Sequence, residues 1–90
     1  MSPIEILQAA KQCLVDKGWG KTSDRCLYVT IDRVVTDPDV WNIIAPTALR
    51  AIRTVIGCES IVAWNDRQES ALPVFAAIDA AIELLKQEGT

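Results

Sequence analysis

The sequence predicts one all-α domain over residues 1–90, folded as a small orthogonal bundle of about four to five helices. Apolar residues recur at helical spacing over most of the chain, proline and cap-forming residues stand before these stretches, and glycine follows several of them. Half of the residues are hydrophobic and 23% are charged, which is typical of a globular protein. Two segments, 24–35 and 58–64, also fit an extended conformation.

The first predicted helix begins after Ser2, which is followed by a proline at the first helical position and by Glu5 at capping-box spacing. Its apolar face consists of Ile6, Leu7, Ala10, Cys13 and Leu14. Gly18 predicts the left-handed C-cap that ends this helix. In the loop 19–23, we expect Trp19 to fold back onto the core.

Residues 24–35 support two interpretations. Every second residue from Leu27 to Ile31 is apolar, and the Val, Thr, Ile and Tyr content of the segment favours a strand. The length of the segment, its charged residues and a potential cap at Ser23 or Asp24 favour a helix. We predict a helix here.

A short helix is predicted next, with Thr36 or Asp37 as its cap and proline at its first position. It carries four apolar residues, Val40, Trp41, Ile43 and Ile44. Pro46 begins an amphipathic helix that runs to Ile56, where Gly57 ends it.

The closing helix is expected to start near Ser70, with Pro73 in its first turn, and to run to Gly89. The connecting segment 58–64 fits either one helical turn capped by Ser60 or an extended run.

The formal charge of the chain is −3, and no part of it is strongly basic. Residues 1–35 carry five Lys and Arg against four Asp and Glu, residues 36–69 carry three against five, and residues 70–90 carry one against three. Nucleic-acid binding depends on clustered cations, so we expect no nucleic-acid partner. Arg50 and Arg53 follow the short helix and suggest a helix-turn-helix, but the connection before them is tight and lacks glycine.

The three cysteines, Cys13, Cys26 and Cys58, are odd in number, lack CxxC spacing and lie in apolar stretches. They predict buried free thiols and a reducing, cytoplasmic compartment. Because the chain has no histidine, we expect no metal site and no cofactor, and imidazole cannot act as a base. No apolar run approaches about 18 residues and the N-terminus lacks the order of a signal peptide, so no membrane partner is expected.

Four short motifs follow one another along the chain: Gly18-Trp19, Cys26-Leu27, Ala45 to Leu49, and Trp64-Asn65-Asp66. In this order they resemble a family of small uncharacterised domains known mainly from actinobacterial genomes and their phages. Members of that family usually have Gly-Ala after the Cys-Leu pair and a longer, Gly-rich loop before it, where this chain has Tyr28-Val29-Thr30. The family has no assigned activity, so the resemblance implies a fold and a phage-related origin.

The Trp-Asn-Asp motif supports two interpretations. In the structural one, which we favour, Trp64 fills the core while Asn65 or Asp66 accepts backbone hydrogen bonds from the next turn, with Glu69 completing a capping box. In the functional one, Asn65 and Asp66 form the polar rim of an aromatic binding pocket that is shared with Trp19 or Trp41. A single carboxylate without histidine or a metal cluster is not a catalytic constellation, so we expect no enzymatic activity.

The leading hypothesis is a non-enzymatic protein-interaction module, phage-related, that acts on a host protein or as a homodimer. It rests on the high apolar content of a short chain and on its three tryptophans. The candidate interface residues are Val40, Trp41, Ile44, Arg50 and Arg53. The alternative is a small-molecule or nucleotide binding module lined by the Trp-Asn-Asp motif and Trp19, and a DNA-binding regulator comes third.

Overall fold

Six α-helices make up the regular structure of the part of the chain that the computed structural model describes, residues 1–21 and 24–89. In chain order they are α1 (Pro3–Lys17), α2 (Leu27–Val34), α3 (Pro38–Ile43), α4 (Ala45–Ile56), α5 (Ile61–Asp66) and α6 (Leu72–Gln87). The predicted all-α class is confirmed. Segments 24–35 and 58–64 hold helices rather than strands, and the helices are more numerous than predicted.

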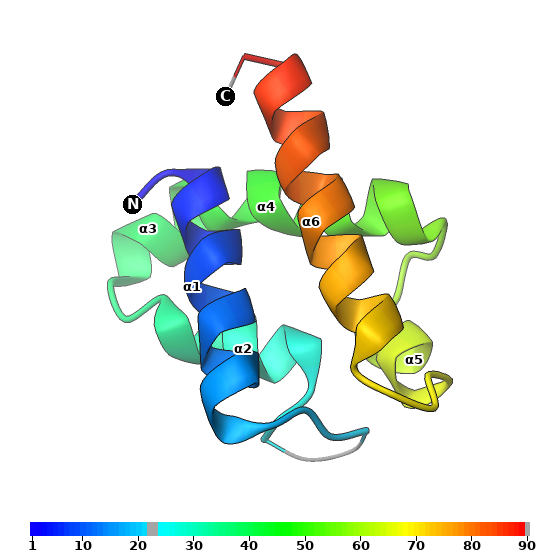
Figure 1. Ribbon diagram of the computed structural model, residues 1–90. Helices are drawn as coiled ribbons and strands as arrows, with labels where there is room; N and C mark the ends of the chain where they lie inside the picture. The colour runs from blue at the N-terminus through cyan, green and yellow to red at the C-terminus, as the bar shows by residue number, and fades with distance from the viewer. Residues whose placement is uncertain (22–23, 90) are drawn as a thin grey trace.

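Three helices form the centre of the fold. α1 and α6 lie side by side, and α4 passes behind them and crosses both (Figure 1). α2 packs against α1, α5 packs against α2 and α4, and α3 lies at the periphery against α4. The small helices therefore surround a frame built from the three longest ones.

The core consists of aliphatic side chains on the inner faces of these helices. Large side chains with no exposed surface are Ile6, Leu7, Leu27, Ile31, Ile52, Val74, Ile78 and Leu85. Alanines with no exposed surface come from the three central helices: Ala10, Ala45, Ala48, Ala51 and Ala81. Since the distance between helix axes depends on the side chains at the contact, these alanines allow the central helices to approach closely.

Helix α1 begins with the predicted capping box. The hydroxyl of Ser2 accepts a hydrogen bond from the backbone N–H of Glu5 at 3.1 Å, and the backbone N–H of Ser2 donates to Glu5 Oε1 at 2.8 Å. These bonds favour the charged carboxylate and lower the pKa of Glu5 from its ordinary value. At the other end, Gly18 has a φ of 89° and donates its N–H to the carbonyl of Leu14.

Helix α2 has a cap that the sequence did not suggest. The cap residue is Cys26, whose Sγ accepts a hydrogen bond from Val29 N at 3.4 Å. Asp24, one of the two expected caps, instead pairs with Arg33. The other expected cap, Ser23, lies outside the described residues.

The next three helix boundaries follow the predicted capping. Asp37 caps α3, since its Oδ1 accepts from the N–H of Asp39 at 2.9 Å. Gly57 ends α4 in the left-handed conformation, with a φ of 65°. Ser60 caps α5 by accepting from the N–H of Ala63 at 3.1 Å, which explains why this segment is helical rather than extended.

Helix α6 starts later than expected, at Leu72 rather than near Ser70. The preceding residue, Ala71, has no side-chain oxygen and makes no side-chain cap. Pro73 lies in the first turn as predicted, where its missing N–H costs no intrahelical hydrogen bond.

The capping box predicts a pH effect at the start of α1. Because the folded pKa of Glu5 is lowered, the contribution of its carboxylate is present at neutral pH and is lost as the pH falls through that pKa. An NMR titration should place the pKa of Glu5 below its ordinary value of 4.5. The Ser2→Ala variant keeps the backbone N–H that donates to Glu5 and loses only the hydroxyl, so it should raise this pKa only in part. An equal pKa in both proteins would mean that the Ser2 hydroxyl contributes nothing to the shift.

Ile52 of α4 has no exposed surface. We predict that Ile52→Ala lowers the free energy of unfolding by about 2 to 5 kcal/mol, because it leaves a cavity in the core. Urea denaturation measures the change. The matched control is Val15→Ala, since Val15 is 56% exposed on the outer side of α1. This control should change the free energy by no more than about 0.5 kcal/mol.

Candidate functional site

The side chain of Asn65 joins three separate parts of the chain. It has no exposed surface, although it is an amide. Its Oδ1 accepts from Trp19 Nε1 at 2.7 Å and from the backbone N–H of Leu27 at 3.1 Å. Its Nδ2 donates to the carbonyls of Gly20 at 3.2 Å and Lys21 at 3.0 Å. A carboxamide has two donors and two acceptor sites, so its hydrogen-bonding capacity is fully used.

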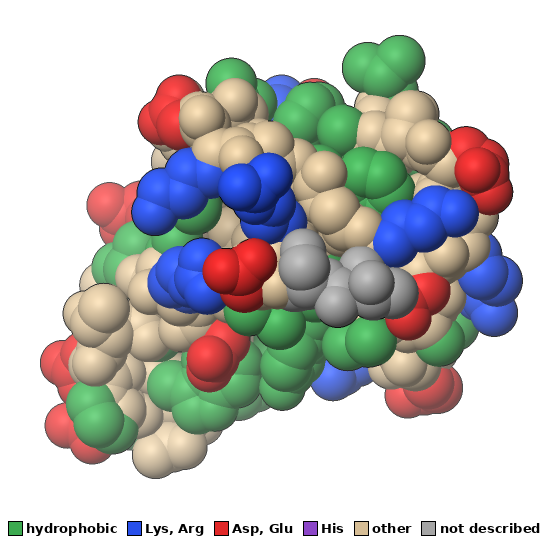
Figure 2. Space-filling view, turned by 90° about the horizontal axis from the view of Figure 1, so that it is seen from below, with side chains coloured by type: hydrophobic (Ala, Val, Ile, Leu, Met, Phe, Trp, Pro, Cys, Tyr) green, Lys and Arg blue, Asp and Glu red, His purple; other side chains and the backbone are tan. Residues whose placement is uncertain are grey.

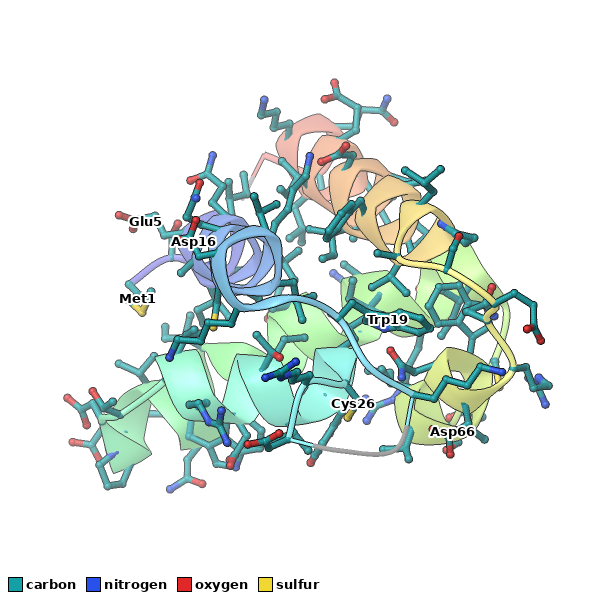
Figure 3. The ribbon with its side chains drawn as sticks, turned by 60° about the horizontal axis from the view of Figure 1, so that its bottom comes forward. Met1, Glu5, Asp16, Trp19, Cys26 and Asp66 are labelled. Atoms are coloured by element: carbon teal, nitrogen blue, oxygen red, sulfur yellow. The ribbon has the colours of Figure 1, made fainter. Side chains whose placement is uncertain are left out.

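These bonds place Asn65 in a different role from either interpretation of the sequence. Its partners lie in the loop after α1 and at the start of α2, not in the turn that follows α5. Trp19 folds back as expected: it is half-buried, packs on the core and points from that loop towards α5 (Figure 3). The structure thus brings together Trp19 and Asn65, two of the predicted binding residues, through a direct hydrogen bond.

The other two residues of the motif are less enclosed. Trp64 is half-buried against the core rather than fully buried, and its carbonyl accepts from Gln68 Nε2 at 2.8 Å. Asp66 is partly buried, and its Oδ1 has no hydrogen-bond partner among the described residues. The expected capping box with Glu69 is absent from the described structure, where Glu69 pairs with Lys21 at 3.3 Å.

The predicted interface residues of α3 are half-buried. Val40, Trp41 and Ile44 all pack against the core. The ring of Trp41 meets that of Tyr28 edge to face, with centroids 6.2 Å apart and planes at 87°. The most exposed apolar residue of this helix is one that the sequence analysis did not select, Ile43, which is 71% exposed.

Arg50 and Arg53 are engaged within the chain. Arg50 forms an ion pair with Glu88 at 2.8 Å, and this carboxylate raises the pKa of the guanidinium. Arg53 donates from Nε to the carbonyl of Glu59 at 3.0 Å. The two arginines line one hollow of about 480 Å³ along the end of α4 and the connection after it. The partner of Arg50 follows α6 and the partner of Arg53 follows α4, so neither partner lies on α3.

A second hollow, of about 290 Å³, lies between α1 and α2, and its lining includes Lys17, Arg25 and Arg33. The sequence patterns did not indicate this hollow. The one indication in the sequence is that residues 1–35 hold five of the nine Lys and Arg of the chain. This indication is weak, because those cations lie far apart in the sequence.

Two features are not found among the described residues: a metal-binding group and a membrane-spanning helix. Residues 1–21 and 24–89 contain no group of three or more His, Cys, Asp or Glu arranged to hold a metal ion. None of the helices found there has the length and apolar character needed to cross a bilayer. The three cysteines are free thiols, and only Cys26 is fully buried.

Comparison with known proteins assigns a family. The model of a family of unknown function, DUF6197, matches residues 1–84. No curated protein and no solved structure matches the chain.

The geometry of Asn65 predicts that Asn65→Ala lowers the free energy of unfolding by about 3 kcal/mol, because four hydrogen-bonding groups lose their partner. Urea denaturation followed by circular dichroism measures this. Asn42→Ala is the matched control, since Asn42 is exposed on α3, and its effect should stay within about 0.5 kcal/mol. Equal effects of the two substitutions would show that the Asn65 network contributes nothing to stability.

Proposed function

The chain belongs to the DUF6197 family, whose function is unknown, and we propose that it is a non-enzymatic protein-interaction module that binds its partner through α3. The contact surface, which we name the α3 surface, consists of Val40, Trp41, Ile43 and Ile44. The observation that carries the proposal is the 71% exposure of Ile43 beside three half-buried apolar side chains.

Helix α3 is only partly covered by the rest of the fold. None of its six residues is fully buried, and it packs mainly against α4. Val40, Ile43 and Ile44 are spaced three and four residues apart, so they lie on neighbouring positions of the helix surface. Full burial of an isoleucine side chain contributes about 1.5 to 3 kcal/mol, and a partner that covers Ile43 would gain most of this.

The charges around α3 indicate the chemistry of the partner. Asp37 and Asp39 are exposed at its N-terminal end, and the whole chain carries a charge of −3. Carboxylates at one end of an apolar contact favour a partner that has an apolar anchor next to Lys or Arg. We therefore propose a basic protein surface as the partner, with a second copy of the chain as the competing outcome.

Further parts of the proposal concern origin and setting. The order of the Gly-Trp, Cys-Leu and Trp-Asn-Asp motifs supports a phage-related origin, with a host protein as the partner. The free thiols of Cys13, Cys26 and Cys58 support a reducing, cytoplasmic setting.

The two alternative functions have less support. A ligand site on the Trp-Asn-Asp motif is disfavoured because the polar atoms of Asn65 already bind other residues of the chain. The acidic charge gives a DNA-binding role little support.

The proposal predicts that Ile43→Glu weakens partner binding by at least about tenfold, because a buried apolar contact is replaced by a charge. Circular dichroism should show unchanged helix content, since Ile43 is mostly exposed. Ile43 is a cleaner probe than Trp41, whose ring packs against Tyr28. The control is Val15→Glu, which places the same charge at an exposed valine of α1.

The experiment compares affinity capture from the native host by the parent and both variants, followed by calorimetry with the purified partner. A partner that binds the parent and Val15→Glu but not Ile43→Glu supports the proposal. Equal binding of all three proteins would exclude the α3 surface. If analytical ultracentrifugation shows a dimer that only Ile43→Glu dissociates, the occupant is a second copy rather than a basic partner.

A further inference from the structure

We propose that the hollow between α1 and α2 binds a small molecule that carries a phosphate group. We name it the α1–α2 pocket, and its volume is about 290 Å³. Its lining includes Cys13, Leu14, Lys17, Asp24, Arg25 and Arg33. This site is separate from the α3 surface, so neither proposal depends on the other.

Three cations converge on this pocket from three different elements. Lys17 comes from the last turn of α1, Arg25 from the loop before α2, and Arg33 from the last turn of α2. Asp24 is the only carboxylate in the lining, so the lining carries a net charge of +2 in a chain whose total is −3. Figure 2 shows Lys and Arg side chains gathered on this face of the molecule. Such a concentration of positive charge attracts anions.

The carboxylates near the pocket neutralise it only in part. Arg33 Nη2 meets Asp24 Oδ2 at 3.4 Å, and both side chains are well exposed, so this ion pair is weak. Lys17 has no carboxylate paired with it among the described residues. Asp16 and Asp32 are adjacent in sequence to two of the cations but do not line the pocket, and Asp16 accepts from Gln12 Nε2 at 2.9 Å.

Hydrogen bonds hold the backbone next to one of these cations, Arg25. The backbone on both sides of the loop is fixed by Asn65, which binds the carbonyls of Gly20 and Lys21 and the N–H of Leu27. Within the loop, Gly20 donates its N–H to the carbonyl of Arg25 at 3.1 Å. Because the backbone at Gly20, Arg25 and Leu27 is already fixed by these bonds, that part of the site loses less conformational entropy when a ligand binds.

The residue types and the volume define the class of ligand. Guanidinium groups match the oxygen geometry of a phosphate and bind it through paired hydrogen bonds, and a lysine adds a point charge. Cys13 and Leu14 supply an apolar wall for an organic group. The volume of about 290 Å³ lies just below the range of about 300 to 1,000 Å³ for small-molecule sites, so a small metabolite fits and a peptide helix does not.

A simpler explanation is that these cations only stabilise helix C-termini. Lys17 and Arg33 each lie in the last turn of a helix, where a positive charge interacts favourably with the helix dipole. Lys86 holds the same position on α6. It is therefore the matched control, because it shares the position at a helix end but not the α1–α2 pocket.

The test is a titration with phenyl phosphate, followed by NMR of the backbone amides at low salt. We expect saturable shifts confined to residues 13–18 and 24–33. Lys17→Ala and Arg33→Ala should each weaken binding by about tenfold, whereas Lys86→Ala should leave it unchanged. Circular dichroism establishes that each variant is folded.

Three outcomes would overturn the proposal. The first is the absence of saturable shifts in the parent protein. The second is an equal loss of binding in Lys86→Ala, which would mean a general response to charge. The third is tighter binding of a short DNA duplex than of phenyl phosphate at the same residues, which would make the surface a nucleic-acid site. Tighter binding of phenyl phosphate than of inorganic phosphate would support a role for the apolar wall.

Discussion

The carboxamide of Asn65 orders the parts of the chain that apolar packing alone does not hold. The central helices α1, α4 and α6 bury aliphatic side chains against one another. Residues 19–21 follow α1 without forming a helix, and α5 is only six residues long. A buried amide without partners costs free energy, so the loop and α5 must come together for its four hydrogen bonds to form. This requirement fixes where residues 19–21 and the start of α2 lie relative to α5.

Helix α2 connects the two surfaces to which we assign binding roles. Tyr28, near its start, packs against Trp41 of the α3 surface. Arg33, in its last turn, lines the α1–α2 pocket. The α2 N-terminus is in turn held by the bond from Leu27 to Asn65. One short helix thus takes part in the core, the apolar surface and the basic pocket.

Local patterns predicted most of the helices, because caps act within a few residues. Ser2 and Glu5 are a clear example, since both partners of each hydrogen bond lie in one turn. The cap of α2 was missed because a cysteine sulfur is a weak acceptor that propensity rules do not favour at this position. The start of α6 was misplaced because Ser70 is a good cap residue that the chain does not use there.

The candidate sites were harder to predict, because they depend on contacts between distant residues. The Trp-Asn-Asp motif drew attention to the correct segment, but no local rule links Asn65 to Trp19, 46 positions earlier. Likewise, Lys17 and Arg33 come together only once α1 and α2 have packed. The sequence also does not show which apolar side chains are exposed. Trp41 and Ile43 lie on the same short helix, and tertiary packing alone decides which of them faces the solvent.

The bonds of Asn65 also have a consequence for the order of folding. They span 38 to 46 positions, so none of them can form until α5 has been made and has docked onto the rest of the chain. Individual helices form much faster than contacts of this sequence separation. Residues 19–21 are therefore among the last of the described residues to reach their final positions. Once they have done so, the amide hydrogen of Leu27, which is bonded to Asn65 and not within α2, exchanges with water when the contact between α2 and α5 opens.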